Sequence, residues 1–130
     1  MAILGKHAER IYGLMRFVAG ALFACHGAQK LFGSFGGQKR TGNTLLTIAA
    51  VIELVAGGLI ALGLFTAPAA FVASGEMAVA YFKFHASGGF LPIVNHGELA
   101  VVYCFLFLFI ACHGSGTFSL DALFFKRRAE

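Results

Sequence analysis

Four long apolar runs constrain the fold of this chain more than any other feature. They cover residues 11–32, 44–65, 69–84 and 97–112. A helix needs about 20 residues, each rising about 1.5 Å, to cross a hydrocarbon core about 30 Å thick. The first two runs reach that length, and the last two need flanking residues to do so. The sequence therefore predicts four crossing helices at about 11–32, 44–65, 68–87 and 96–113.

The composition indicates that lipid is the solvent of these helices. Of the 130 residues, 58% are hydrophobic and 12% are charged, whereas soluble domains are about half apolar and about a quarter charged. Because lipid offers the backbone no hydrogen-bond partners, each run should form a complete helix. We expect an all-α integral membrane four-helix bundle, with residues 1–130 as one domain in contact with the lipid bilayer.

The connections and the basic residues predict a topology. Four crossings put both termini on one side, and that side collects six of the ten Lys and Arg residues. The positive-inside rule then makes both termini of a multi-pass protein cytoplasmic. Residues 114–130 are expected to be an interfacial basic tail. The net charge of +4 suits anionic lipid, and no soluble basic face is available for nucleic acid.

Two glutamates in the middle of the runs are the best functional clues. Counted along the helices, Glu53 lies about 15 Å deep and Glu76 about 12 Å from the opposite surface. A charge at such depth costs at least about 2.5 kcal/mol, so each should face the bundle, a partner or water. We expect Glu76 to be ionised in a structural ion pair with Arg16, while Glu53 stays neutral or meets the side of His26. The alternative is that Arg16 snorkels to the headgroups and Glu76 is protonated.

Further polar side chains gather at the non-cytoplasmic ends of the helices. The first helix offers His26 and Lys30 on one face, the third ends near His85, and the fourth opens at His96 and Glu98. The predicted ligand-binding residues are therefore His26, Lys30, Glu53, His85, His96 and Glu98, in one pocket with Glu53 beneath the others. The alternative is that each is an interfacial anchor. Histidines and carboxylates are metal ligands, but no helix carries a paired ligand motif, and no metal is assigned.

Two cysteines leave a redox question open. Cys25 and Cys104 each fall about 10 Å below the outer surface by helical rise. That matched depth permits a redox pair if the first and fourth helices touch. The alternative is that both are small buried apolar residues.

Five segments in succession resemble the DoxX family of small four-helix bacterial inner-membrane proteins. In order, they read RFVAGALFACHGAQKLFG, ELVAGGLIALGLFTAPAA, GEMAVAYFKFH, GFLPIVNHGELAVVYCFLFLF and GSGTFSLD. The resemblance covers nearly the whole chain, although at Ala67 and Pro68 family members often carry a basic residue after the threonine. It places the family's characteristic polar positions on Arg16, His26, Gly27, Lys30, Glu53, Glu76, His85, Asn95, Gly97, Glu98 and Asp121.

The resemblance implies an association with respiratory or sulfur-compound oxidation, because relatives include a subunit of a thiosulfate:quinone oxidoreductase. The leading hypothesis is a membrane subunit of a redox system in the bacterial inner membrane, whose pocket binds a quinone-like or small sulfur-containing ligand. His26, His85 or Glu98 would hydrogen-bond that ligand, and Glu53 would exchange protons. The alternative is a non-enzymatic scaffold or assembly factor for a soluble redox partner. A homo-oligomer or a redox partner protein is compatible with both, and whether the chain is itself an enzyme stays open.

Overall fold

The computed structural model describes residues 1–125, which fold as helices and connections with no strand among them. The all-α prediction is confirmed. The basic residues 126–130 of the expected interfacial tail lie outside the described residues. The elements are η1 (Gly5–His7), α1 (Ala8–Phe32), α2 (Thr44–Leu62), α3 (Thr66–Ala80), the π-helical turn η2 (Tyr81–His85), η3 (Ala86–Gly88), α4 (Pro92–Asn95), α5 (Glu98–His113) and α6 (Leu120–Phe125).

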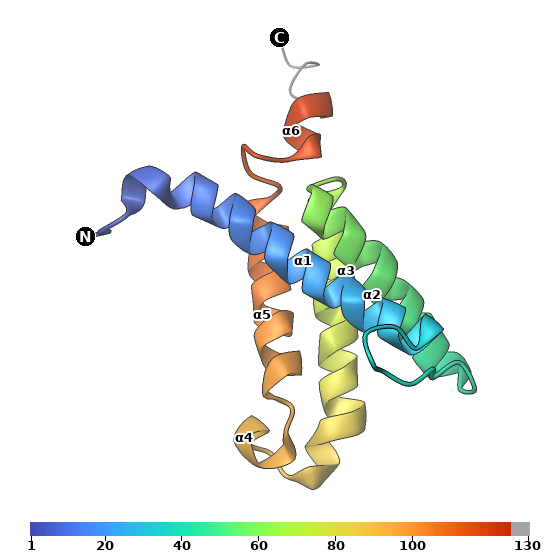
Figure 1. The fold of residues 1–130 in the computed structure, drawn as a ribbon. Coiled ribbons are helices and arrows are strands. Elements are labelled where there is room, and N and C mark those ends of the chain that lie inside the picture. The colour runs from blue at the N-terminus through green and yellow to red at the C-terminus, as the bar shows by residue number, and fades with distance from the viewer. Residues whose placement is uncertain (126–130) are drawn as a thin grey trace.

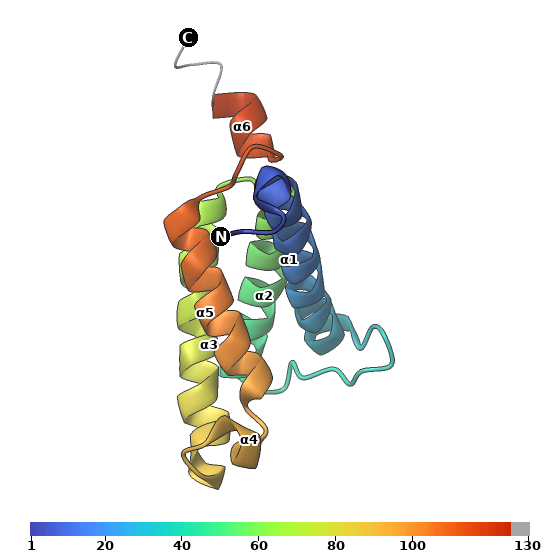
Figure 2. The same ribbon diagram turned by 90° about the vertical axis from the view of Figure 1, so that its left-hand side faces the viewer.

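The long helices pack as two antiparallel pairs. α1 packs along α2, α3 packs along α5, and α2 also contacts α3 (Figure 1). The turned view separates the two pairs, with α1 and α2 on one side and α3 and α5 on the other (Figure 2). In both views the α2–α3 turn and α6 lie at one end of the bundle, and α4 lies at the other.

Glycines let α1 and α2 approach closely. A Cβ atom added to Gly27 would overlap the backbone of Ala50 and Leu54, and one added to Gly57 would overlap the backbone of Gly20 and Ala24. Small residues at such spacing allow the backbones of neighbouring helices to touch. This contact holds Lys30 of α1 beside Glu53 of α2.

The turn between α2 and α3 lies earlier in the chain than the sequence suggested, at residues 63–65 and not 66–67. Gly63 has a φ of 71°, a left-handed conformation that favours glycine and ends α2 at Leu62. α3 begins at Thr66, two residues before the predicted start, because the Asp121 carboxylate accepts hydrogen bonds from the backbone N–H groups of Phe65 and Thr66. A residue far along the chain therefore caps this helix.

The core is mainly apolar, but two charged side chains are buried in it and much of the surface is apolar as well. Phe23 and Phe107 form the centre of the core and pack with ring centroids 4.8 Å apart. The charged side chains of Arg16 and Glu53 are buried as deeply as these rings, whereas large apolar side chains on all four long helices are exposed. By length and composition, two helical segments suffice to cross a membrane, residues 5–32 and 44–62.

Candidate functional site

A pocket of about 410 Å³ lies between the helices at the end opposite α6. Residues from α1, α2, α3, η2, α5 and the segment before α5 form its wall. Five of the six predicted ligand-binding residues belong to this lining, namely His26, Lys30, Glu53, His85 and His96. Their role in ligand binding stays a prediction. The rest of the lining is Phe23, Arg40, Leu46, Ala49, Glu76, Met77, Ala80, Phe84, Leu99, Ala100 and Tyr103.

An ion pair forms the polar floor of the pocket. The Lys30 ammonium donates a hydrogen bond of 2.6 Å to Glu53 Oε1. The Glu53 side chain is only 2% exposed, whereas that of Lys30 is 26% exposed. The pair crosses the glycine contact between α1 and α2, so the close approach of the two helices brings the two groups together. Charge pairing of this kind is the usual condition for burying a carboxylate.

Two carboxylate oxygens beside this pair have no hydrogen-bond partner. They are Oε2 of Glu53 and Oε2 of Glu76, and both are buried. The two side chains come from adjacent helices and line the same pocket. A buried polar atom without a partner is uncommon and calls for a specific cause such as a missing proton, water or ligand.

An asparagine organises the histidine side of the pocket. Asn95 Nδ2 donates to Tyr81 Oη at 3.0 Å and to the Gly89 carbonyl at 2.8 Å, and its Oδ1 accepts from the Gly97 N–H at 2.8 Å. These bonds fold residues 86–97 back onto η2. Nδ1 of His85 lies 3.4 Å from the Asn95 carbonyl oxygen, so the same network positions this imidazole.

The backbone around the histidines departs from regular helix. The π-helical turn Tyr81–His85 brings the consecutive residues Phe84 and His85 to the pocket lining, and such turns occur often at functional sites. His96 has a φ of 61°, a left-handed conformation that costs a non-glycine residue about 1 kcal/mol. Strain of this kind at a pocket residue is typical of functional positions.

An aromatic wall faces the imidazole of His26. The rings of His26 and Tyr103 meet edge to face with centroids 6.2 Å apart. Tyr103 in turn stacks on Phe107 at 5.3 Å. One side of the pocket is therefore flat and apolar, while the floor beside it carries charge.

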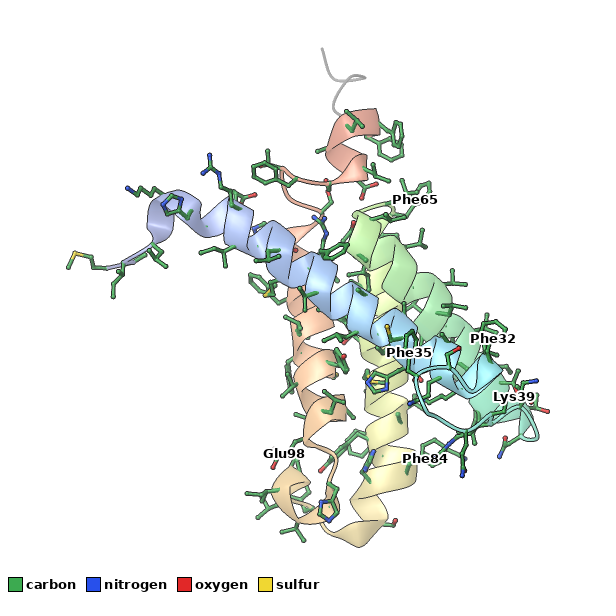
Figure 3. All side chains as sticks on the ribbon, in the orientation of Figure 1. Phe32, Phe35, Lys39, Phe65, Phe84 and Glu98 are labelled. Atoms are coloured by element: carbon green, nitrogen blue, oxygen red, sulfur yellow. The ribbon has the colours of Figure 1, made fainter. Side chains whose placement is uncertain are left out.

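Glu98 differs from the other predicted site residues because the structure does not bring it to the pocket. It is exposed in the first turn of α5 and does not belong to the lining. Figure 3 shows it beside α4, at a distance from the labelled Phe84 of the lining. The prediction that Glu98 shares the pocket is wrong, because this side chain is exposed at the start of α5 and does not belong to the lining.

The predicted ion pair between Arg16 and Glu76 is also wrong. Nε of Arg16 donates to the Ile60 carbonyl at 3.0 Å, and its two terminal nitrogens donate to the carbonyls of Ser115 and Phe118. The guanidinium therefore binds the segment between α5 and α6 to the end of α2. Glu76 instead lines the pocket near Glu53 and Lys30. Depth counted along a helix did not reveal that the chain after α5 returns to cover Arg16.

Two charged pocket residues, Arg40 and Glu76, were not among the predicted ligand-binding set. Arg40 reaches the lining from the connection between α1 and α2, where its N–H donates to the Lys30 carbonyl at 2.8 Å. Glu76 was assigned to a different partner. The equal depth of Glu53 and Glu76 was the sequence signal that could have placed both in one site.

The three cysteines are free thiols. The Ser74 hydroxyl donates to the Cys104 carbonyl at 2.7 Å and lies 3.6 Å from its sulfur, which ties α3 to α5. A redox pair of Cys25 with Cys104 stays a prediction. Within residues 1–125, no three His, Cys, Asp or Glu side chains are grouped closely enough to hold a metal ion.

Comparison with known proteins identifies the family. The model of the family described as DoxX matches residues 12–86. A protein of Haemophilus influenzae, described as an uncharacterized protein, is 41% identical over 131 residues, which cover 95% of this chain and 98% of that relative. No solved structure matches the chain significantly. The resemblance seen in the sequence motifs is confirmed.

Proposed function

Because the chain belongs to the DoxX family, we propose that it crosses the bacterial inner membrane four times and binds a quinone-like ligand in the pocket between its helices. It acts there as the membrane subunit of a redox system. The observation that carries the proposal is the lining of the pocket, which combines a flat aromatic wall with histidines and a buried Lys30–Glu53 pair.

The apolar surface of the helices supports the membrane part of the proposal. Exposed side chains include Phe71, Phe82, Phe105 and Phe109, each more than half accessible. An apolar surface of this extent marks contact with lipid or another protein. α5 is short for a crossing, with 16 residues or about 24 Å of helical rise, and α4 extends it at the pocket end.

The position of the turns supports an even number of crossings. η1, the α2–α3 turn and α6 lie towards one end, and the α1–α2 connection and α4 lie towards the other (Figure 1). This arrangement agrees with both termini being cytoplasmic, which is the orientation that the basic residues favour.

The chemistry of the lining supports a quinone-like ligand over a small sulfur oxyanion. Ligand pockets of about 300–1,000 Å³ usually combine apolar walls with a few polar groups, and this pocket fits that description. Quinone carbonyls accept hydrogen bonds, which the imidazoles of His26, His85 and His96 can donate. The apolar wall of Phe23, Met77 and Tyr103 would contact a ring but leave a small oxyanion without partners there.

Binding of a short-chain quinone to the purified protein tests the proposal. We expect saturable binding in detergent by isothermal titration calorimetry. His26→Ala should weaken it about tenfold, which corresponds to about 1.4 kcal/mol for one lost hydrogen bond. His7→Ala is the matched control, because His7 lies outside the lining, and it should keep the wild-type affinity. Absence of binding by the wild type, or equal losses in both variants, would contradict the proposal.

The exposed connection between α1 and α2 favours the second candidate function, a scaffold for a soluble redox partner. Phe35 is 73% exposed, and it lies in the same connection as Lys39 and Arg40 (Figure 3). Purification in mild detergent followed by quinone extraction separates the two functions. A bound quinone supports the first, and a co-purifying protein that Phe35→Ser releases, without any quinone, supports the second.

A further inference from the structure

The floor of the pocket contains two carboxyl groups but only one cation that pairs with them among the described residues. Lys30 pairs with Oε1 of Glu53 at 2.6 Å. Glu76, on the neighbouring helix, lines the same pocket as Glu53 and Lys30. If both carboxyls were ionised, the floor would carry one uncompensated negative charge away from water, which is costly in a low-dielectric site.

No other described group supplies the missing positive charge from within the bundle. Arg16 donates all its observed hydrogen bonds to backbone carbonyls at the opposite end. Arg40 is exposed at the pocket mouth. The remaining titratable groups that face the pocket are His26 on α1, His85 on η2, His96 before α5 and Tyr103 on α5. Within residues 1–125, none of these forms a salt bridge with either carboxylate.

The two carboxylate oxygens without a partner also indicate that the pocket lacks a proton or another donor. Oε2 of Glu53 and Oε2 of Glu76 are both buried and both lack a hydrogen-bond donor. Two carboxylates can only accept hydrogen bonds, so they cannot satisfy each other while both are ionised. One proton placed between them provides the missing donor and removes the excess charge at the same time. Carboxyl pairs that share one proton are a known consequence of such proximity.

We infer that Glu53 and Glu76 hold a single proton between them, and that Glu76 carries it as the proton donor of the pocket. Lys30 decides which carboxyl is ionised, because its direct hydrogen bond stabilises the charged form of Glu53. The neutral Glu76 then donates its O–H to the Glu53 carboxylate. This assignment reverses the one predicted from the sequence, in which Glu76 was ionised and Glu53 neutral.

The inference goes beyond the proposed function because it concerns the protein without ligand. The proton-holding pair stands even if no quinone binds, and a quinone site could exist without it. When a ligand with a basic oxygen occupies the pocket, Glu76 is the acid that can give it a proton, and the resulting second carboxylate is left beside Lys30.

Infrared spectroscopy of the ligand-free protein tests the inference directly. At pH 7 in detergent, we expect a carbonyl stretching band of a protonated carboxylic acid that shifts in D₂O. Glu76→Gln should abolish it, and Glu98→Gln, which changes an exposed carboxylate, should leave it unchanged. The assignment is overturned if the wild type shows no such band at pH 7 or if the band persists in Glu76→Gln.

Thermal unfolding gives a second test that does not depend on the band. Gln at position 76 can donate an N–H in place of the acid O–H, so Glu76→Gln should unfold within about 2 °C of the wild type. Glu53→Gln and Lys30→Met should each lower the midpoint by several times that amount, about 6 °C or more. Adding Glu53→Gln to Lys30→Met should recover part of the loss. A fall for Glu76→Gln equal to that for Glu53→Gln would refute the neutral role of Glu76.

Discussion

Buried charge lies at two levels of the bundle, with Arg16 near the α2–α3 turn and Glu53 beside the pocket. At the first level the charged group meets its partners, since Arg16 donates to three backbone carbonyls. At the second level Glu53 has one partner, Lys30, and one oxygen without any. Both Arg16 and Glu53 are buried, so burial alone does not distinguish a structural charge from a functional one.

The difference lies in what the surrounding backbone does. Near Arg16, the segment between α5 and α6 folds back so that its carbonyls face the guanidinium, and Asp121 caps α3 from the same segment. Near Glu53, a pocket lies between the helices, and no donor among the described residues reaches the second carboxylate oxygen. The Arg16 level therefore closes the bundle with hydrogen bonds, whereas the Glu53 level contains a pocket.

The largest expected effect in this comparison is on stability at the closed level. Arg16→Leu should lower the free energy of unfolding by at least about 3 kcal/mol, because hydrogen bonds to a charged group contribute about 1.5–3 kcal/mol each and three carbonyls lose their donor. Chemical unfolding in detergent measures the loss. Arg10→Leu, on the exposed part of the same helix, is the control and should change stability by no more than about 0.5 kcal/mol.

A double-mutant cycle with Glu76→Gln sharpens this prediction. Since Arg16 and Glu76 do not share a partner among the described residues, their effects should add within about 0.5 kcal/mol. If Glu76→Gln recovered the stability that Arg16→Leu loses, the ion pair expected from the sequence would be supported. The distinction between the two levels would then not hold.

A smaller effect is expected at the cap of α3. Asp121→Ala removes the acceptors for the N–H groups of Phe65 and Thr66 and should cost about 1–2 kcal/mol of unfolding free energy. Asp121→Asn keeps one acceptor oxygen and should lose about half as much. Equal losses in both variants would mean that the charge on Asp121, and not its two hydrogen bonds, stabilises the turn.

Much of the pocket was predictable because it depends on local order along the chain. His26 and Lys30 are four residues apart and so share a helix face, while His85 and His96 flank one connection. Glu53 and Glu76 flank a tight turn at similar distances, which places them at similar depth. These regularities predicted that His26, Lys30, His85 and His96 lie around one pocket with Glu53, and the structure places all five in its lining.

The errors arose where distant segments meet. The position of Arg16 on its helix fixes its depth, but its partners come from residues 60, 115 and 118, which no periodicity connects. The start of α3 depends on Asp121, which lies 55 residues beyond Thr66. Likewise, the direction of Glu98 depends on how Asn95 folds the preceding loop. Helical spacing predicts faces and depths, whereas contacts between a returning loop and a helix end require the tertiary structure.

The smallest expected effect concerns Glu98, and it tests the boundary of the Glu53 level. Glu98→Gln should leave quinone affinity within about twofold of the wild type and stability within about 0.5 kcal/mol, because the side chain is exposed and outside the lining. His96→Ala, two residues earlier and within the lining, should weaken binding about tenfold. Calorimetric titration of both variants decides the matter. If Glu98→Gln weakened binding as much as His96→Ala, the Glu53 level would extend along the first turn of α5, and the six-residue site expected from the sequence would be reinstated.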